Sequence, residues 1–281
     1  MPLIHFIGCG RLGKTIAKLI VQNNLGIIGG VVNQSLANAE AAIQFVGQGS
    51  AYQTVNELPT ADMIFIATID EVVSDVCQQL ATTDLLKNKP IVAHFSGALS
   101  SDALLSATNC PKASLHPIAS FANPADVVTR FKDVICTLEG DKAACDVLKP
   151  MFQAMGANVC DIAKENKALY HPALVFGHNY MVSLHFTAVK SLLDAGFEPE
   201  LAKKMVSKLM SDALRNIEAT NHQSALTGPL QRGDLAVLTK HMEVLQYDPV
   251  RRNIYKTLGI GTLDLTRHND AMKEKIRKIL M

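Results

Sequence analysis

Three glycines near the start of the chain have the spacing of a phosphate-binding loop. Gly8, Gly10 and Gly13 form the pattern G-x-G-x-x-G. In such a loop the first glycine permits a tight turn, the second lets the backbone approach a pyrophosphate, and the third lets helix and strand pack closely. Free N–H groups at the helix start can then bind phosphate oxygens. The segment Gly8–Gly13, with Arg11 and Leu12, is predicted to bind a dinucleotide; the alternative is an ordinary glycine turn.

Three further residues could transfer a proton. His116 precedes Pro117, which holds it in extended geometry, and a histidine can exchange a proton near neutral pH. Lys167 and His171 are four residues apart and would share one face of a helix. Either could protonate a nascent alkoxide or amine. The alternatives are a packed histidine at a strand end and a solvated lysine at a helix start.

Two residues of the second half could bind a substrate. Asn179 could orient a carbonyl group. Arg232 lies in a Gly/Pro-rich segment, residues 225–233, and could bind a carboxylate or phosphate through two hydrogen bonds; the alternative is that it holds a structural turn. His171, His178 and His185 recur every seven residues. Seven helical residues rise by about 10.5 Å, too far for ligands that bond one zinc at about 2.1 Å, so no metal is predicted.

The elements that position these residues read as strands alternating with helices. A strand over residues 3–7 runs directly into the glycine loop, and this alternation predicts a doubly wound parallel sheet. Ligands bind at the carboxyl ends of such strands, which places Thr68, Ser96 and Gly97 along the cofactor; the alternative for Thr68 and Ser96 is that they are ordinary turn residues. Later strands are predicted over 26–32, 61–68, 89–95, 113–117, 133–138 and 158–162, and helices over 36–48, 69–80 and 141–155.

The end of the second strand bears on the choice of cofactor. Asn33, Gln34 and Ser35 are neutral, whereas an NAD enzyme usually presents Asp or Glu there to the adenosine ribose. A carboxylate would repel a 2′-phosphate, and these side chains can donate hydrogen bonds to it. Arg11 could add a positive charge. We therefore expect NADP rather than NAD, with FAD less favoured.

Helical signals dominate from residue 164 onward. Helices are predicted over 169–195, 198–221 and 270–281, and Asp234 is expected to cap another through Leu245. The chain is therefore expected to contain a dinucleotide-binding domain over residues 1–162 and a helical domain over residues 163–281.

The composition limits the functional class. Apolar residues make up 48% of the 281 residues and charged residues 19%, as in a globular protein. The net charge of +1 gives no electrostatic footprint for nucleic acid or an anionic membrane, and no apolar run is long enough to span a membrane. The six cysteines have no metal-ligand spacing. We therefore expect a cytoplasmic protein without nucleic-acid or membrane partners.

Several motifs together resemble a known family. It is a group of bacterial Rossmann-like proteins, often named as NADP oxidoreductases, with a helical C-terminal domain of unknown function. The resemblance covers essentially the whole chain. The motifs are Gly8–Gly13, Phe95–Ala98, Ser114–Pro117, Lys167–His171 and Thr227–Asp234.

More remotely, the chain is similar to pyrroline-5-carboxylate reductase, prephenate dehydrogenase and the β-hydroxyacid dehydrogenases. These relatives imply a nicotinamide cofactor, a C-terminal domain like that of 6-phosphogluconate dehydrogenase, and homodimers formed through helices. The β-hydroxyacid dehydrogenases carry a catalytic lysine on the first long helix of the second domain, with an asparagine four residues later. Lys167 matches the lysine, and His171 replaces the asparagine.

The expected activity is hydride transfer between NADP(H) and a small carbonyl, imine or hydroxy substrate. His116 or Lys167 would donate the proton, and His171, Asn179 and Arg232 would bind or orient the substrate. Because a fold alone does not establish activity, a non-catalytic NADP-binding sensor or interaction protein is the alternative. An oxidoreductase that uses a deazaflavin as its second substrate is a third possibility.

Overall fold

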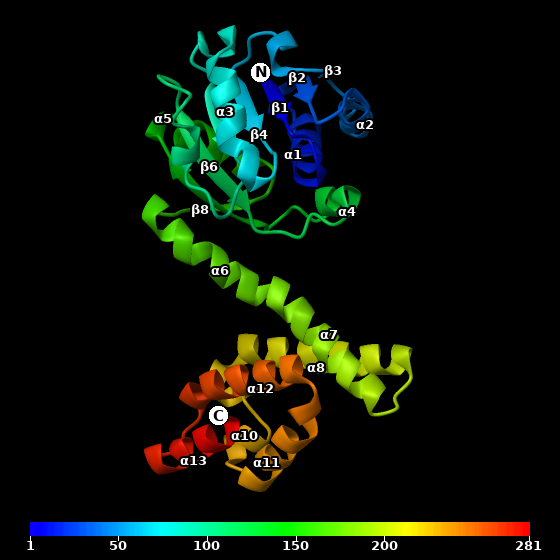
Figure 1. The fold of residues 1–281 in the computed structure, drawn as a ribbon. Helices are drawn as coiled ribbons and strands as arrows, with labels where there is room; N and C mark the ends of the chain where they lie inside the picture. The colour runs from blue at the N-terminus through cyan, green and yellow to red at the C-terminus, as the bar shows by residue number, and fades with distance from the viewer. The chain divides into compact units, whose positions relative to one another are not determined.

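The structure is a computed structural model that describes residues 1–281. The chain divides into two compact units, Met1–Val175 and Phe176–Met281 (Figure 1). The expected boundary followed residue 162. The first unit extends further because it includes the 3-10 helix η5 (Lys164–Asn166) and most of α6 (Lys167–Gly177), whose first buried side chain, Lys167, packs on the sheet.

The first unit contains an eight-stranded sheet in the order β3-β2-β1-β4-β5-β6-β7-β8. Neighbouring strands are parallel, which confirms the predicted doubly wound Rossmann-type fold, except that β6 and β7 are antiparallel. The strands are β1 (Leu3–Ile7), β2 (Ile27–Val32), β3 (Ser50–Tyr52), β4 (Met63–Ile66), β5 (Ile91–His94), β6 (Lys112–Pro117), β7 (Ile135–Gly140) and β8 (Asn158–Asp161).

The antiparallel pair arises because the chain leaves the sheet at the carboxyl end of β6 and enters it again from the same end in β7. Ile118 N, just after β6, donates to Ile135 O at the start of β7 over 2.8 Å. Consequently Glu139 lies opposite Ser114, and Thr137 lies opposite His116. Alternate residues of a strand face the same side of a sheet, so these four side chains share one face.

Helices cover both faces of the sheet. They are α1 (Arg11–Gln22), α2 (Leu36–Val46), α3 (Val73–Ala81), α4 (Pro124–Thr129) and α5 (Lys142–Ala154), with the 3-10 helices η1 (Val55–Glu57), η2 (Asp70–Val72), η3 (Asp84–Leu86) and η4 (Ser101–Leu104). Neither β3 nor α4 was predicted.

Two apolar cores result from the alternation of side chains along the strands. Phe6 of β1 packs in one core with residues of α1, α2, α4 and α5. Ile7, the next residue, packs in the other core with residues of α3. Strands buried on both faces read as continuous apolar runs, which is why β1 and β4 could be recognised from the sequence.

The second unit is entirely helical, as predicted. Its helices are α7 (Asn179–Asp194), α8 (Pro199–Ala219), α9 (His222–Ala225), α10 (Pro229–Arg232), α11 (Leu235–Val244), α12 (Pro249–Thr262) and α13 (Asp270–Leu280), with the 3-10 helices η6 (Leu245–Tyr247) and η7 (Leu263–Leu265). Asp234 caps α11 as expected, its side chain accepting from Val237 N at 3.2 Å. The helices α9, α10 and α12 were not predicted.

The prediction of one helix over residues 169–195 is wrong. Helix α6 ends at Gly177 and α7 begins at Asn179, with His178 between them at φ −118°. Glycine disfavours helix interiors because it has the most backbone freedom to lose, which explains the break. Pro172 lies inside α6 without ending it.

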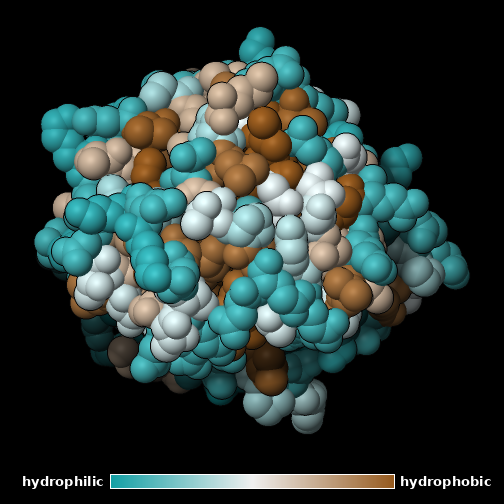
Figure 2. All heavy atoms as spheres, turned by 90° about the horizontal axis from the view of Figure 1, so that it is seen from above, coloured by the Kyte–Doolittle hydropathy of each residue, from teal (hydrophilic) through white to brown (hydrophobic).

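The surface of the molecule is mixed in polarity. On the face drawn in Figure 2, apolar atoms appear among hydrophilic side chains, which dominate the rim. None of the helices combines the length and apolar character that crossing a membrane requires.

Candidate cofactor and active site

The three glycines of the Gly8–Gly13 loop lie in different surroundings. Gly8 has φ +83°, and a Cβ there would lie 2.5 Å from Thr68 Cγ2. A Cβ on Gly13 would lie 3.0 Å from Gly8 O, so this glycine permits close packing of helix and strand. A Cβ on Gly10 would meet nothing within 4 Å. The space in front of the first turn of α1 is therefore open, as access of a phosphate group to the helix start would require.

The end of β2 is tied to this loop. Asn33 Oδ1 accepts a hydrogen bond from Cys9 N at 2.6 Å, so its oxygen is occupied and its Nδ2 remains a donor. Ser35 Oγ accepts from Asn38 N at 3.3 Å and caps α2. Gln34 and Arg11 are exposed. Asn33 thus supports the loop in addition to any contact with the cofactor.

A cavity of about 260 Å³ lies at the carboxyl ends of β4, β5 and β6. Two buried polar atoms of its lining residues, Thr68 Oγ1 and His171 Nδ1, have no hydrogen-bond partner. Buried polar groups are nearly always paired, so these atoms fit a polar ligand in the cavity. Its lining is Leu12, Ala67, Thr68, Asp70, Phe95, Ser96, Gly97, His116, Pro117, Ala119, Phe121 and His171.

Helix α6 supplies one wall of this site. Lys167, Tyr170 and His171 have the i, i+3, i+4 spacing that places side chains on one helical face. Tyr170 contacts His116 on β6 and Thr137 on β7. His171 lines the cavity with its ring 6.4 Å from that of His116. Sequence-distant residues are therefore brought together by the β6–β7 pair and α6.

Lys167 is only 1% exposed, which excludes the solvated lysine considered above. Its Nζ donates to Ser96 O at 2.9 Å and contacts Ser114 Oγ. Glu139 Oε1 lies 3.9 Å away. Burial lowers the pKa of Lys167 from 10.5 to about 8, while the charges of Glu139 and Asp70 act in the opposite direction. Lys167 does not line the cavity; it holds the Ser96 turn from behind.

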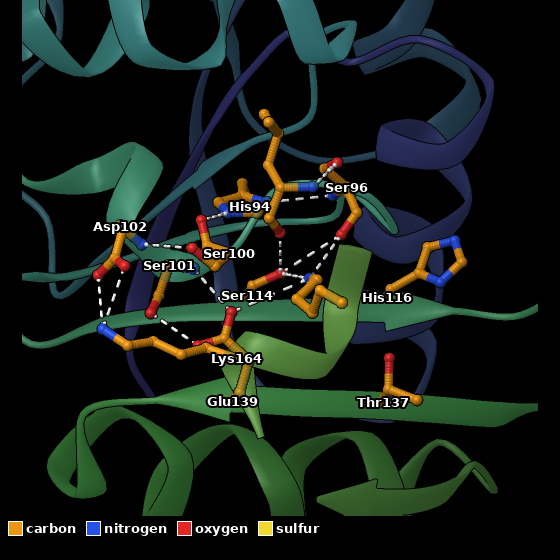
Figure 3. A network of polar contacts seen from close by, with 12 residues as sticks. His94, Ser96, Ser100, Ser101, Asp102, Ser114, His116, Thr137, Glu139 and Lys164 are labelled. Atoms are coloured by element: carbon orange, nitrogen blue, oxygen red, sulfur yellow. Dashed lines mark hydrogen bonds and ion pairs between the residues drawn. The ribbon is translucent and has the colours of Figure 1, made fainter. Parts of the chain in front are cut away.

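Glu139 is the buried carboxylate of this cluster. Its Oε1 accepts from Ser101 N and its Oε2 from Ser101 Oγ, each at 2.7 Å (Figure 3). A buried charge is tolerated when it is paired and hydrogen-bonded, and Glu139 meets both conditions. Nearby, Lys164 forms an ion pair with Asp102 at 2.9 Å on the surface.

His94 shapes the same turn from the other side. Its Nδ1 accepts from Ser96 N at 3.1 Å, and its Nε2 lies 3.0 Å from Ser100 O (Figure 3). This pair of contacts requires a proton on Nε2 only, hence a neutral ring. Burial lowers the pKa of His94 to about 4, which agrees with that assignment.

His116 has a partner that the sequence analysis did not identify. Its Nδ1 lies 2.8 Å from Tyr170 Oη, and Thr137 Oγ1 donates to the same oxygen at 3.2 Å. Burial lowers the pKa of His116 to about 4, with further contributions from Lys167 and His171. The ring is therefore neutral at physiological pH. Tyr170 could have been found from its place one helical turn after Lys167.

The remaining predicted residues belong to the second unit. Asn179 is the exposed first residue of α7, and Arg232 is the exposed last residue of α10. Their substrate-binding roles stay predictions.

No group of three or more His, Cys, Asp or Glu side chains is placed to hold a metal ion.

The first unit is a Rossmann-type α/β fold with a glycine loop after its first strand, and it is followed by a helical second unit. Residues 3–97 match the family described as NADP oxidoreductase, coenzyme F420-dependent. Residues 134–262 match a domain of unknown function, DUF2520. The two parts of the chain are thus similar to an NADP oxidoreductase family and to DUF2520, which confirms the resemblance seen in the sequence. No protein with a curated functional description matches this chain.

Solved structures share the fold over nearly the full chain. A Bacteroides fragilis protein provisionally named an NADP oxidoreductase has 20% identity and a TM-score of 0.78, covering 94% of this chain and 98% of its own. A pyrroline carboxylate reductase of Plasmodium falciparum, solved with NADP bound, has 14% identity and a TM-score of 0.59 over 100% and 98%. A prephenate dehydrogenase of Aquifex aeolicus has 12% identity and a TM-score of 0.55 over 93% and 99%. At these identities the likeness establishes the fold.

Proposed function

We propose that this protein is an NADP-dependent oxidoreductase that transfers a hydride between the nicotinamide and a small carbonyl, imine or hydroxy substrate. One observation carries the proposal: the open space at Gly10 is followed two residues later by Leu12, which lines the cavity with the unpaired Thr68 and His171 atoms. A dinucleotide whose pyrophosphate lies at the loop would thus have its nicotinamide end beside two imidazoles.

The residues of the candidate site have different roles in the proposed reaction. When bound, NADPH supplies the hydride. Thr68, Ser96 and Gly97 flank the nicotinamide, and the unpaired Nδ1 of His171 gives or takes the proton at the reacting atom. His116 orients the substrate. Lys167 is a positioning residue in this scheme, because its Nζ is enclosed by Ser96 O and Ser114 Oγ.

We propose NADP rather than NAD as the cofactor. The Asn33 amide nitrogen, Gln34 and Ser35 offer donors at the end of β2 where a carboxylate would select against a 2′-phosphate, and the exposed Arg11 adds a positive charge. The matching family is one of NADP oxidoreductases, and a structural relative was solved with NADP bound.

Cofactor titration is the first test. NADPH should raise the melting temperature more than NADH at equal concentration, because a ligand that binds only the folded state stabilises it. Equal shifts would refute the preference for NADP, and no shift with either would refute the function.

Hydride transfer is the second test. NADPH deuterated at C4 is mixed with a panel of small keto acids, ketones and cyclic imines, and deuterium is sought in the product. His116→Ala and His171→Ala should lower turnover while NADPH still binds. Tight NADPH binding without turnover of any member would favour the sensor, the alternative function.

A deazaflavin is a second candidate for the hydride acceptor, because the matching family is described as coenzyme F420-dependent. Mixing NADPH with the oxidised deazaflavin and following its visible absorbance decides this point. Bleaching that depends on the protein would identify the deazaflavin as substrate, and constant absorbance would exclude it.

The roles of Asn179 and Arg232 require a separate test. Arg232 could bind an anionic group of the substrate, and Asn179 could orient its carbonyl. Arg232→Ala should raise the KM for acidic substrates more than the KM for neutral ones. An equal effect on both classes would assign Arg232 to the structural turn.

We further propose a homodimer formed through the helical unit. Val182 and Phe186, four residues apart on α7, are 59% and 68% exposed, and burial of such side chains drives association. Light scattering should give twice the chain mass of 30.4 kDa, and Phe186→Asp should return the monomer. A wild-type monomer would refute this partner assignment.

All six cysteines are free, which fits the reducing cytoplasm we propose as its compartment.

A further inference from the structure

Three polar side chains from three different elements meet beside the cavity. His116 comes from β6, Thr137 from β7 and Tyr170 from α6. Tyr170 Oη lies 2.8 Å from His116 Nδ1 and accepts from Thr137 Oγ1 at 3.2 Å. The tyrosine and histidine rings are nearly perpendicular, at 85°, with centroids 5.8 Å apart. The function proposed above assigned no role to Tyr170 or Thr137.

One arrangement of these hydrogen bonds selects a single histidine tautomer. A tyrosine hydroxyl has a single hydrogen to donate. Thr137 donates to the hydroxyl oxygen, and Tyr170 can direct its own hydrogen to Nδ1 of His116 at 2.8 Å. In that arrangement Nδ1 is the unprotonated nitrogen. A neutral imidazole with an unprotonated Nδ1 carries its proton on Nε2.

The protonated nitrogen faces the cavity. A Cβ built on Gly97 would lie 3.0 Å from His116 Nε2 and 2.8 Å from His171 Nδ1. Both atoms therefore lie over Gly97, where the nicotinamide and the substrate are expected. His116 Nε2 presents an N–H group to this space, and His171 Nδ1 has no hydrogen-bond partner.

We propose that Tyr170 is a positioning residue that holds His116 as the Nε2–H tautomer, so that His116 donates a hydrogen bond to the acceptor atom of the substrate. This assignment rests on the proposed oxidoreductase function. A carbonyl oxygen has the lone pair that such a donor needs, whereas a protonated imine nitrogen has none. The histidines then differ in role: His116 binds the carbonyl oxygen, and His171 exchanges the proton.

Burial supports this division. Burial, together with the smaller effects of the neighbouring Lys167 and His171, lowers the pKa of His116 to about 4. The ring therefore remains neutral at pH 7, as a tautomer-specific donor must. Thr137 is 8% exposed, so its own hydroxyl group is largely shielded from water.

The tautomer can be measured directly by NMR. Long-range ¹H–¹⁵N spectra of protein with ¹⁵N-labelled histidine distinguish a protonated ring nitrogen from an unprotonated one, and a His116→Asn variant assigns the signals. At pH 7.5 the wild type should show protonated Nε2 and unprotonated Nδ1 at His116. Tyr170→Phe, which keeps the ring, should give mixed tautomers. Thr137→Val should give a smaller change in the same direction.

The second unit offers a matched control. His241 Nδ1 lies 2.7 Å from Tyr255 Oη, with the rings at 89°. Tyr255→Phe should alter the signals of His241 and leave those of His116 unchanged. A wild-type His116 protonated on Nδ1, or the same Nε2–H tautomer in Tyr170→Phe, would overturn the proposal.

The kinetic measurement uses whichever carbonyl substrate the NADPH panel identifies. Tyr170→Phe should lower kcat between about 10-fold and 100-fold, by analogy with the loss seen when a group that orients a metal-ligating histidine is removed, with the KM for NADPH unchanged. An unchanged kcat would contradict the role in the reaction. The NMR result is independent of turnover, so failure of this inference and failure of the proposed function are distinguishable.

Discussion

Lys167→Met tests the buried cation behind the candidate site. The pKa of Lys167 is lowered from 10.5 to about 8, and each pH unit of such a difference corresponds to about 1.4 kcal/mol. The interior therefore disfavours the ammonium group by roughly 3 kcal/mol relative to water. Removing the side chain leaves Glu139 without its cation, and breaking a buried ion pair in this way typically costs about 3–5 kcal/mol at neutral pH.

The pH dependence gives the sign of the effect. Between pH 8 and 10.5 the unfolded chain still holds the lysine proton, whereas the folded chain has released it. Stability therefore rises with pH in this window. Lys167→Met lacks the titrating group, so the stability of the wild type relative to the variant should increase by about 2 kcal/mol between pH 7 and pH 9.5.

Urea unfolding measures this difference. The chain has no tryptophan, so a Tyr52→Trp background gives a fluorescence signal that belongs to the first unit. Other groups that titrate in this range are common to both proteins and cancel. A difference that stays constant or shrinks as the pH rises would show that the folded protein does not disfavour the Lys167 ammonium group, and the reasoning would fail.

Two glycines give further predictions for the first unit. In Gly97→Ala the new Cβ would lie 2.8 Å from both His116 Cε1 and His171 Nδ1, so both rings must shift. We expect a loss of about 1–3 kcal/mol in urea unfolding and weaker NADPH binding by titration; unchanged affinity would place the cofactor elsewhere. In Gly8→Ala the residue has φ +83° and its Cβ would lie 2.7 Å from the backbone nitrogen of Thr68. The melting temperature should fall further than for Gly97→Ala, and an equal or smaller fall would contradict the tight turn.

The sequence predicted the Rossmann-type sheet because the determining signals are local. A buried strand leading into the Gly8–Gly13 loop and then a helix is read from adjacent residues. The helical second half and the cap by Asp234 also depend on local spacing. The helix α10 was missed because Pro229 lies in the segment 225–233 that was assigned to a loop, although proline is favoured in the first turn of a helix. Helix α12, for which no prediction was made, also begins with a proline, Pro249.

The partners of the site residues could not be predicted in the same way. Lys167 contacts Ser96 and Ser114, which precede it by 71 and 53 residues. Those contacts depend on the antiparallel pairing of β6 with β7 and on the position of α6. Neither can be recognised from a pattern of adjacent residues. The buried Glu139 in an apolar strand was a signal that could have been noticed, because an acidic residue is rarely fully buried unless it is paired.

The central claim is that the open space at Gly10 receives the pyrophosphate of NADP(H). NADPH titration of Gly10→Ala tests it most directly, because a Cβ there meets no protein atom within 4 Å and its φ of −74° suits any residue. Gly261→Ala, in α12 and equally unobstructed, is the matched control. Without cofactor, we predict that neither variant lowers the melting temperature; Gly261→Ala should raise it slightly, because alanine is favoured over glycine within a helix. The Kd for NADPH should rise at least about 10-fold, or about 1.4 kcal/mol, in Gly10→Ala alone. Wild-type affinity in Gly10→Ala would contradict the account.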